Sequence, residues 1–162
     1  MTKSIAVGSD DAGFGLKEEV KKYLESEGHI VTDYGCPSPD PVDYPDVALL
    51  VADAVARGQH DRAILICGTG IGMAISANKV PGVYAAVAHD AYSAAKARTS
   101  NNTQVLALGA RVVAPELATT LVGIWLRSEF GGGASARKVG KIEKAERRLT
   151  RKRTPGRPSV KR

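Results

Sequence analysis

One short segment, Cys67–Gly72, places a reactive thiol next to three glycines at alternating positions. It follows an apolar run that is typical of a buried strand, and it leads into a helix-like segment. Glycines let the backbone come close to a ligand, and the first amide N–H groups of a helix attract an anion. A helix start also favours the thiolate form of a cysteine. The segment predicts a base or nucleophile beside an anion hole; a core cysteine buried under a glycine turn is the alternative.

The same stretch of sequence excludes two common nucleotide-binding motifs. A dinucleotide fingerprint that began at Gly68 would need glycine at position 73, which is Met73, and no Gly-Lys-Ser/Thr follows as in a phosphate-binding P-loop. The residue types that bind zinc show no ligand spacing. The cysteines and histidines that could bind a metal are scattered along the chain: Cys36, Cys67, His29, His60 and His89. We therefore expect no cofactor and no metal.

Five short apolar runs predict strands that are buried on both faces. They alternate with segments whose apolar residues recur on one helical face, such as Leu16, Val20 and Leu24. This alternation favours a parallel sheet with helices on both sides. The expected fold is α/β, a single three-layer αβα domain with a five-stranded parallel Rossmann-like sheet and a C-terminal helix from near Ala136. The predicted strands lie at 5–8, 30–32, 63–67, 83–88 and 105–108, and the predicted helices near 16–24, 45–57, 91–98 and 117–125.

Ligands of an open parallel sheet bind beyond the carboxyl ends of its strands. The residues that follow the predicted strands are therefore candidate site residues. Besides Cys67–Gly72 they include Asp10 and Asp11, then His89, and then Arg111. Two alternatives remain open, because Asp11 could instead cap the following helix, and His89 is either an acid/base group or a local hydrogen-bond partner.

Composition and charge indicate one domain with a basic extension. The chain has 162 residues, 43% of them hydrophobic, and no run of about 18 apolar residues that would suit a membrane span. Without a secretory signal, and with two cysteines, it is expected to be cytoplasmic and free of disulfides. Eight basic residues and no acid lie within 147–162, and without them the net charge of +6 becomes −2. We expect a domain at 1–150 and a flexible basic tail at 151–162 that does not bind nucleic acid.

Six segments in a fixed order carry a resemblance to a known enzyme family. Two of them are Cys-Gly-Thr-Gly-Ile-Gly at 67–72 and Ala-Asn-Lys-Val-Pro-Gly at 77–82, a highly specific combination. Together the segments closely resemble the ribose-5-phosphate isomerase B family, which includes the galactose-6-phosphate isomerase subunits. The resemblance spans about residues 5–146. The other four segments are 10–17, 43–45, 100–102 and 109–112.

The resemblance implies an aldose–ketose isomerase in which Cys67 moves a proton between C1 and C2, with Thr69 beside it. The amides of 68–72 would hold the enediolate. A small sugar phosphate would be the ligand, and a homo-dimer or homo-tetramer would form the sites at subunit interfaces. Tyr44 either reaches the substrate or packs over the loop. The residues expected to contact the sugar are Asp10, Asp11, Tyr44, Gly68, Gly70, Ile71, Gly72, Ser100 and Asn101, and those expected to bind the phosphate are Arg111, Arg137 and Lys138.

Four departures from the family pattern stand out. Asp11 and Ser100 stand where relatives usually have histidines, and the second of those histidines is thought to open the sugar ring. Residues 134–135 are Ala-Ser in place of Arg-His. Lys138 replaces an arginine, although the neighbouring Arg137 restores the match after a shift of one residue. Because the base loop is kept while the ring-opening group is changed, the same reaction on a different substrate is expected.

A four-carbon sugar phosphate is the expected substrate, as in a tetrose-phosphate branch that this serine pattern resembles. A five-carbon aldose 5-phosphate closes a furanose ring through its 4-hydroxyl, whereas in erythrose 4-phosphate that hydroxyl carries the phosphate. Ser100 is a poor proton carrier at neutral pH, so a substrate without a ring suits it. The expected reaction converts D-erythrulose 4-phosphate to D-erythrose 4-phosphate. The alternatives are a type B ribose-5-phosphate isomerase and a non-catalytic phosphosugar-binding regulator.

Overall fold

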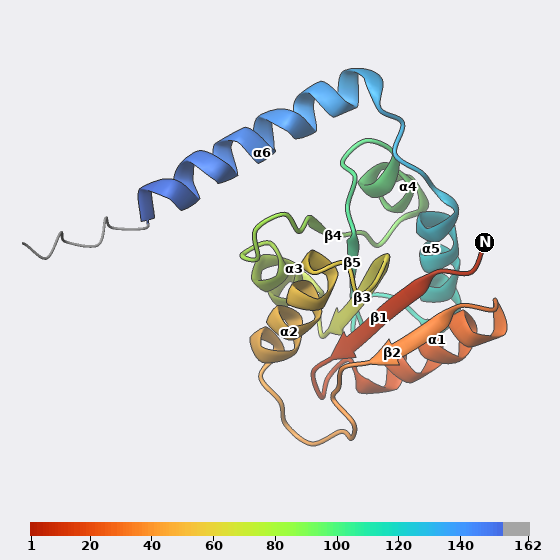
Figure 1. Ribbon diagram of the computed structural model, residues 1–162. Coiled ribbons are helices and arrows are strands. Elements are labelled where there is room, and N and C mark those ends of the chain that lie inside the picture. Colours follow the sequence, from red (N-terminus) through yellow and green to blue (C-terminus); the bar gives the residue numbers. More distant parts are fainter. Residues whose placement is uncertain (154–162) are drawn as a thin grey trace, which may run out of the picture.

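The expected parallel sheet is present in the computed structural model, which describes residues 1–153, with side chains as far as Arg151 (Figure 1). Its strands are β1 (Ser4–Ser9), β2 (Ile30–Asp33), β3 (Arg62–Cys67), β4 (Ala85–Val87) and β5 (Val105–Gly109). All five run parallel, in the spatial order β2-β1-β3-β5-β4. The order reverses between β1 and β3, so the crevice at their carboxyl ends is the expected ligand position.

The central strands owe their place to uninterrupted apolar sequence. Every residue of β3 and of β5 is buried, as predicted for strands covered on both faces. The two strands pair in register, with Ile64 opposite Leu106 and Cys67 opposite Gly109. The edge strand β2 is largely exposed. Cys67 therefore lies at the sheet edge, at the end of a strand that is buried along its whole length.

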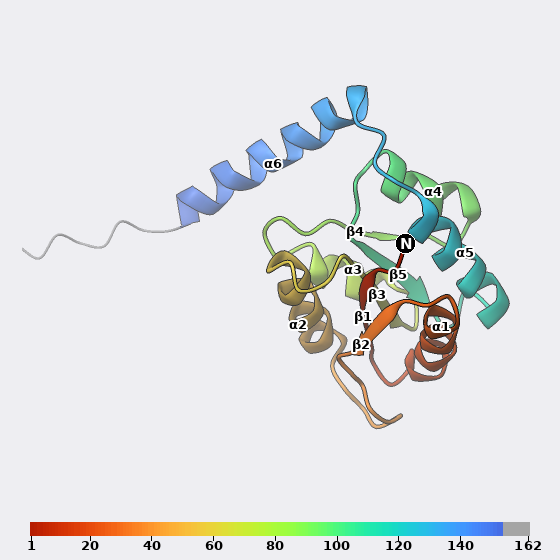
Figure 2. The same cartoon turned by 45° about the vertical axis from the view of Figure 1, so that its right-hand side comes forward.

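Six helices complete the described chain: α1 (Phe14–Ser26), α2 (Tyr44–Ala56), α3 (Ile71–Ala77), α4 (Ala91–Thr99), α5 (Pro115–Arg127) and α6 (Gly133–Arg153). Helices α1, α4 and α5 cover one face of the sheet, and α2 and α3 cover the other (Figure 2). Two separate hydrophobic cores result. The three-layer αβα prediction is confirmed.

Local sequence signals set the helix starts near the site. Pro45 lies in the first turn of α2, where its fixed φ suits the helix and its missing N–H costs nothing. Asp90 caps α4 as predicted, because its side chain accepts a hydrogen bond from the Ser93 N–H at 2.7 Å. Glycine starts α3 instead, and Gly70 is its N-cap.

Helix α6 reaches away from the layers in both views (Figures 1 and 2). It begins at Gly133, three residues before the predicted start, and continues to Arg153. Val139 is buried, and Glu146 accepts a hydrogen bond from the Gly82 N–H at 3.0 Å. The first three residues of the predicted tail belong to this helix, and residues 154–162 lie outside the described chain. Within the described part, no helix is both long and apolar enough to cross a membrane.

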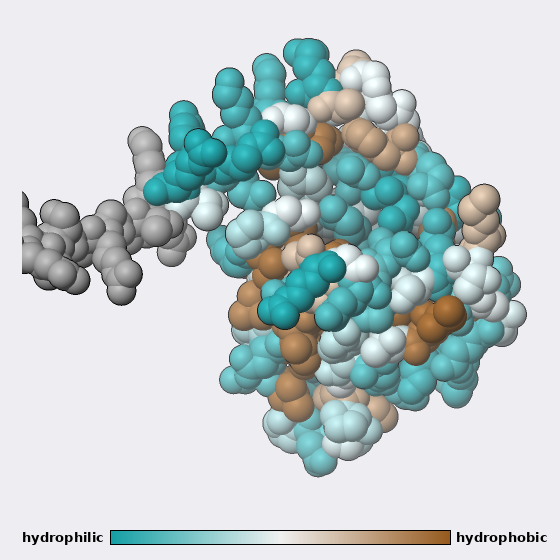
Figure 3. Space-filling view, in the orientation of Figure 1, coloured by the Kyte–Doolittle hydropathy of each residue, from teal (hydrophilic) through white to brown (hydrophobic). Residues whose placement is uncertain are grey.

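The surface carries two contrasting regions. Hydrophilic side chains dominate the outward side of α6, whereas hydrophobic ones gather over α2 and α3 (Figure 3). The same helix α6 also exposes Ile142 and Leu149, by 50% and 56%. The exposed apolar residues on α2 and α3 are Tyr44, Leu49, Leu50, Ile71 and Ile75.

Candidate active site

Cys67 ends β3 at the carboxyl edge of the sheet, where it is 5% exposed. Its Sγ accepts a hydrogen bond from the backbone N–H of Gly70 at 3.1 Å. Gly70 has a φ of +78°, a left-handed conformation that residues with a Cβ avoid. The glycine thereby turns its amide toward the sulfur. The structure thus places the predicted thiol next to a backbone donor.

The other two glycines bring predicted site residues close to the loop. A Cβ on Gly72 would lie 2.6 Å from the ring of Tyr44, so the tyrosine covers the start of α3. A Cβ on Gly68 would lie 3.6 Å from the side chain of Arg111, which is ordinary van der Waals contact. Tyr44 and Arg111 therefore both contact the segment that follows Cys67. The Tyr44 ring packs on the loop, and the residue remains 41% exposed.

A second turn, 109–112, is hydrogen-bonded to the loop that follows the thiol. The Ala110 N–H donates to the Cys67 carbonyl at 2.8 Å, and the Arg111 N–H donates to the Gly68 carbonyl at 3.0 Å. These bonds fix the backbone of Arg111 against the base loop, while its side chain is exposed. The guanidinium is therefore free to meet an anion beside the loop.

Thr69 lies at the contact between these two turns. A Cβ on Gly109 would lie 2.8 Å from the Cα of Thr69, so a larger residue at 109 would push the two turns apart. The Thr69 Oγ1 accepts a hydrogen bond from the Ile71 N–H at 3.4 Å. Thr69 and Ile71 are both exposed, on the loop that also carries the thiol.

Asp10 and Asp11 follow β1, the neighbour of β3. Asp10 Oδ1 accepts a hydrogen bond from the Gly13 N–H at 2.9 Å. Burial raises the pKa of Asp10 above its ordinary value, and the Asp11 carboxylate adds to the rise, while the Gly13 amide and the more distant Arg111 oppose it. Asp11 is exposed. The residue that binds a backbone amide ahead of α1 is thus Asp10, and that amide belongs to Gly13, the N-cap of the helix.

His89 has the local hydrogen-bond role that the sequence left open. It follows β4, and its Nε2 accepts a hydrogen bond from the Gly109 N–H at 2.9 Å. The imidazole therefore contacts the 109–112 turn directly.

The remaining predicted residues lie at the opposite edge of the sheet. Helix α4 runs back antiparallel to the strands, so its C-cap, Ser100, is at the amino edge, and the Gln104 N–H donates to Tyr84 just before β4. The Gly131 N–H donates to Thr99 at 3.0 Å and ties the start of α6 to the same edge. One chain thus separates two groups of predicted site residues. The carboxyl-edge group comprises Asp10, Asp11, Tyr44, the loop 67–72 and Arg111. The amino-edge group comprises Ser100, Asn101, Arg137 and Lys138.

Lys17 supports the site although the sequence analysis gave it no role. It is fully buried, and its Nζ forms an ion pair with Asp33. Asp33 also accepts the Gly35 N–H at 2.9 Å, and the Gly35 carbonyl accepts the Ser9 N–H at 2.7 Å. The pair thereby holds the segment that lines the end of β1. A lysine beside Leu16 on an apolar helix face was the signal available.

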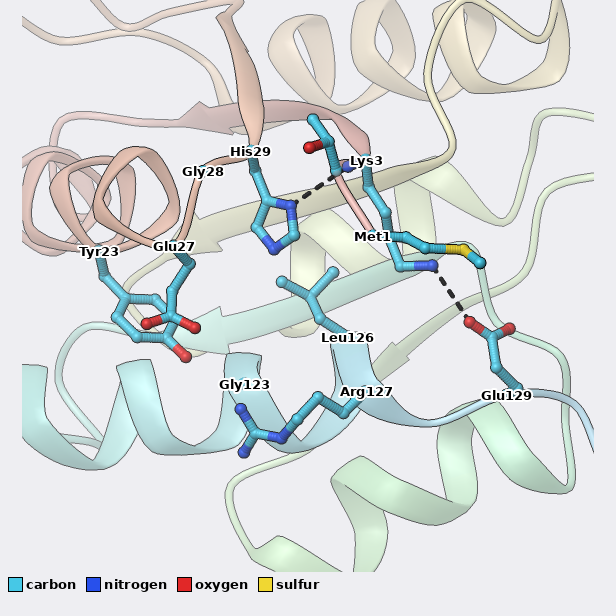
Figure 4. A pocket seen from close by; sticks show the side chains of 11 residues that line it. Met1, Lys3, Tyr23, Glu27, Gly28, His29, Gly123, Leu126, Arg127 and Glu129 are labelled. Atoms are coloured by element: carbon cyan, nitrogen blue, oxygen red, sulfur yellow. Dashed lines mark hydrogen bonds and ion pairs between the residues drawn. The ribbon is translucent and has the colours of Figure 1, made fainter.

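A cavity of about 550 Å³ opens at the amino edge and not beside Cys67. Figure 4 shows Lys3, His29 and Glu129 around it, with the Lys3 Nζ paired to Glu129 at 3.1 Å and the Lys3 N–H donating to His29 Nδ1 at 3.2 Å. None of the predicted site residues lines this cavity. It is therefore distinct from the carboxyl-edge group.

The carboxyl-edge group has the components for moving a proton on an anionic substrate. It combines a thiol with a backbone donor, a hydroxyl, two carboxylates and a guanidinium around one loop. Between residues 1 and 153, no three His, Cys, Asp or Glu side chains come together as metal ligands would.

A family model, curated relatives and a solved structure all relate this chain to sugar or sugar-phosphate isomerases. A family described as Ribose/Galactose Isomerase matches residues 5–142. A D-erythrulose-4-phosphate isomerase of Pectobacterium atrosepticum is 56% identical over 86% of this chain and 92% of that protein. D-erythrulose-4-phosphate isomerase 2 of Mycolicibacterium smegmatis is 50% identical over 88% and 96%. The structure of Clostridium thermocellum ribose-5-phosphate isomerase B superposes with a TM-score of 0.89 at 47% identity, covering 90% of this chain and 99% of that one.

Proposed function

The chain belongs to the Ribose/Galactose Isomerase family, and from this we propose that it is an aldose–ketose isomerase that acts on a small sugar phosphate. The observation that carries the proposal is the Cys67 thiol, which holds the Gly70 amide on its sulfur beside an exposed arginine, Arg111. A non-catalytic regulator would need the arginine but not the thiol or its donor. The base loop therefore favours the enzyme.

The proposed reaction moves one proton between C1 and C2 of the open-chain sugar. The Cys67 thiolate takes the proton from the carbon next to the carbonyl, and the carbonyl oxygen becomes the oxyanion of an enediolate. The first amides of α3 have no acceptor within the helix and stabilise this oxyanion. The thiol then returns the proton to the adjacent carbon, while the hydroxyl proton passes from the first carbon's oxygen to the oxyanion, so that a hydroxyl and a new carbonyl result. Thr69, on the same loop, contacts a substrate oxygen.

The other carboxyl-edge residues orient the substrate. Arg111 binds the phosphate, since a guanidinium can grip two phosphate oxygens at once. Asp10, Asp11 and Tyr44 contact the sugar hydroxyls. This orientation places the phosphate on one side of the loop and the reacting carbons over Cys67.

D-erythrulose 4-phosphate, converted to D-erythrose 4-phosphate, is the proposed substrate. Two similar proteins carry the name D-erythrulose-4-phosphate isomerase, at 56% and 50% identity. Ser100 supports the same choice, because an open-chain tetrose phosphate needs no acid/base group to open a ring. The second candidate is ribose 5-phosphate, which the 47% identity to a ribose-5-phosphate isomerase B favours.

Each active site is proposed to form between two copies of the chain, in a homo-dimer or homo-tetramer. Ser100, Asn101 and Lys138 lie at the amino edge of the sheet, away from Cys67 of the same chain. They contribute only if a second copy brings its amino edge to the first copy's carboxyl edge. The exposed apolar residues on α2, α3 and α6 offer surface for that contact.

The cytoplasm is the proposed compartment. Cys36 and Cys67 are both buried free thiols, as expected where thiols stay reduced. Sugar phosphates are charged metabolites that membranes retain there.

An isomerase assay across four-, five- and six-carbon sugar phosphates tests the proposal. The expected result is turnover with the highest kcat/KM for D-erythrulose 4-phosphate. A value for ribose 5-phosphate equal to or above the tetrose value would favour the second candidate. Binding of these compounds without any turnover would favour a phosphosugar-binding regulator.

A further inference from the structure

His89 accepts a backbone hydrogen bond that has no part in the proposed mechanism. Its ring is half-buried between the end of β4 and the 109–112 turn. The Nε2 atom accepts the Gly109 N–H at 2.9 Å. An acceptor nitrogen needs a free lone pair, so this bond requires a neutral imidazole with its proton on Nδ1. Protonation would turn Nε2 into a donor that faces another donor.

The turn that His89 holds is the one that supports the base loop. Gly109 packs against Thr69, and the next two amides donate to the carbonyls of Cys67 and Gly68. The same turn carries Arg111. A shift at Gly109 would therefore move the hydroxyl, the base and the phosphate ligand together.

The surroundings of His89 favour the neutral ring. Burial lowers the pKa of His89 below its ordinary value, and the exposed Asp90 carboxylate next to it works in the opposite direction. The turn that packs against the ring contributes one charged group, Arg111, whose guanidinium extends along Gly68. Because the pKa of His89 is lower in the folded protein, the neutral ring and its bond to Gly109 stabilise the fold fully above the ordinary histidine pKa. This stabilisation is lost as the pH falls through the pKa of His89 in the folded protein.

We propose that neutral His89 is a positioning residue that holds the 109–112 turn, and with it Cys67 and Arg111, in the active arrangement, and that its protonation releases the turn. The inference rests on the proposed isomerase function. Protonation of His89 would then set the lowest pH at which the enzyme is active, although His89 does not contact the substrate.

Two variants of His89 separate positioning from mere packing. In His89→Gln the side-chain carbonyl can still accept the Gly109 N–H, but it does not titrate in this range. Activity near neutral pH should stay within about threefold of wild type. In the pH–activity profile, the fall in activity at low pH that is due to His89 (the acid limb) should disappear. In His89→Leu the Gly109 N–H loses its acceptor, and kcat should fall about tenfold or more while circular dichroism shows a folded protein.

Asp90→Asn is the matched control, because an asparagine still caps α4 but no longer raises the pKa of His89. Its acid limb should move to lower pH, with neutral activity retained. Wild-type activity in His89→Leu, or a wild-type acid limb in His89→Gln, would overturn the proposal.

A spectroscopic measurement keeps the test independent of the proposed activity. The amide signal of Gly109 in a ¹H–¹⁵N NMR spectrum should shift as His89 protonates in the wild type and stay flat in His89→Gln. A wild-type Gly109 signal that does not follow the His89 titration would reject the positioning role, whether or not the protein is an isomerase.

Discussion

At the scale of single residues, the Cys67 sulfur is held by one backbone donor from a glycine in a left-handed conformation. Cys67→Ala should fold normally and lose about a thousandfold or more in kcat, because the reaction loses its proposed base. Cys67→Ser should also be severely impaired, since a serine hydroxyl does not ionise near neutral pH. Steady-state kinetics with the tetrose phosphate measure both effects, and near-normal turnover in Cys67→Ala would exclude the mechanism.

Arg111 allows a test of how the substrate is oriented. Arg111→Ala should lower kcat/KM by about a hundredfold, because the phosphate loses its charged, two-pronged partner. Arg111→Lys should recover only part of the loss, since an ammonium is a point charge. Arg127→Ala, at an exposed arginine on the opposite edge, is a control that should leave kcat/KM unchanged. Normal kinetics in Arg111→Ala would show that the phosphate lies elsewhere.

The position of the thiol and its glycines at the end of a buried strand was predictable, because an apolar run stops at Cys67 and a glycine-rich turn follows. Lys17 was not, since a lysine on a helix reads as surface until its partner Asp33 is known to lie within reach. The hydrogen bond from Gly109 to His89 was likewise out of reach, because it joins residues 20 positions apart through the pairing of two strands.

At the scale of helices and strands, the boundaries followed from apolar runs, prolines and caps, and they were predicted to within a few residues. The main difference concerns α6, which starts at Gly133 and not near Ala136. Residues 131–133 are all glycine, and Gly132 and Gly133 both have positive φ and form the turn that begins the helix. Sequence alone does not show which glycines of a run are already part of a helix.

The Lys17–Asp33 pair predicts how the packing of α1 against β2 depends on pH. Burial alone would raise the pKa of Asp33, but hydrogen bonds from Lys17, Gly35 and Lys21 outweigh it and lower the pKa below its ordinary value. The stabilisation is therefore present above the ordinary aspartate pKa and is lost as the pH falls through the lower folded value.

Lys17→Met should accordingly reduce the free energy of unfolding by roughly 2 kcal/mol at neutral pH. The difference from wild type should shrink at a pH below the ordinary aspartate pKa, because Asp33 loses its charge as the pH falls through its folded value. Lys22→Met is the control, because the Lys22–Glu19 pair is exposed and should contribute little. Urea unfolding at both pH values measures the effect, and an equal loss at the two would contradict the assignment.

At the C-terminal end of α6, a truncation tests the proposed domain boundary. A chain that ends after Leu149 should keep kcat almost unchanged, because the removed residues are polar and strongly basic and the proposed site residues of this helix, Arg137 and Lys138, are retained. Gel filtration and kinetics of the full and shortened chains measure this. A collapse of either oligomerisation or turnover would show that the removed residues complete a subunit contact.

At the scale of the whole molecule, the two groups of site residues lie at opposite edges of one sheet. Mixing two inactive variants tests whether they meet between copies. Cys67→Ala damages the carboxyl edge and Asn101→Ala the amino edge, so a mixed dimer would hold one intact site. Co-refolding equal amounts should restore about a quarter of wild-type activity. Each variant refolded alone is the control, and no recovery in the mixture would place each site within a single chain.

The proposed division of the site between two sheet edges has a consequence for how the protein behaves at low abundance. If neither edge is sufficient alone, a single chain is half an enzyme, and specific activity falls on dilution even though every subunit stays folded. A cell that makes little of this protein would then lose activity faster than it loses protein. An inactive copy with an intact amino edge would still complete its neighbour's site, so the two chains of a mixed dimer would not lose both sites together.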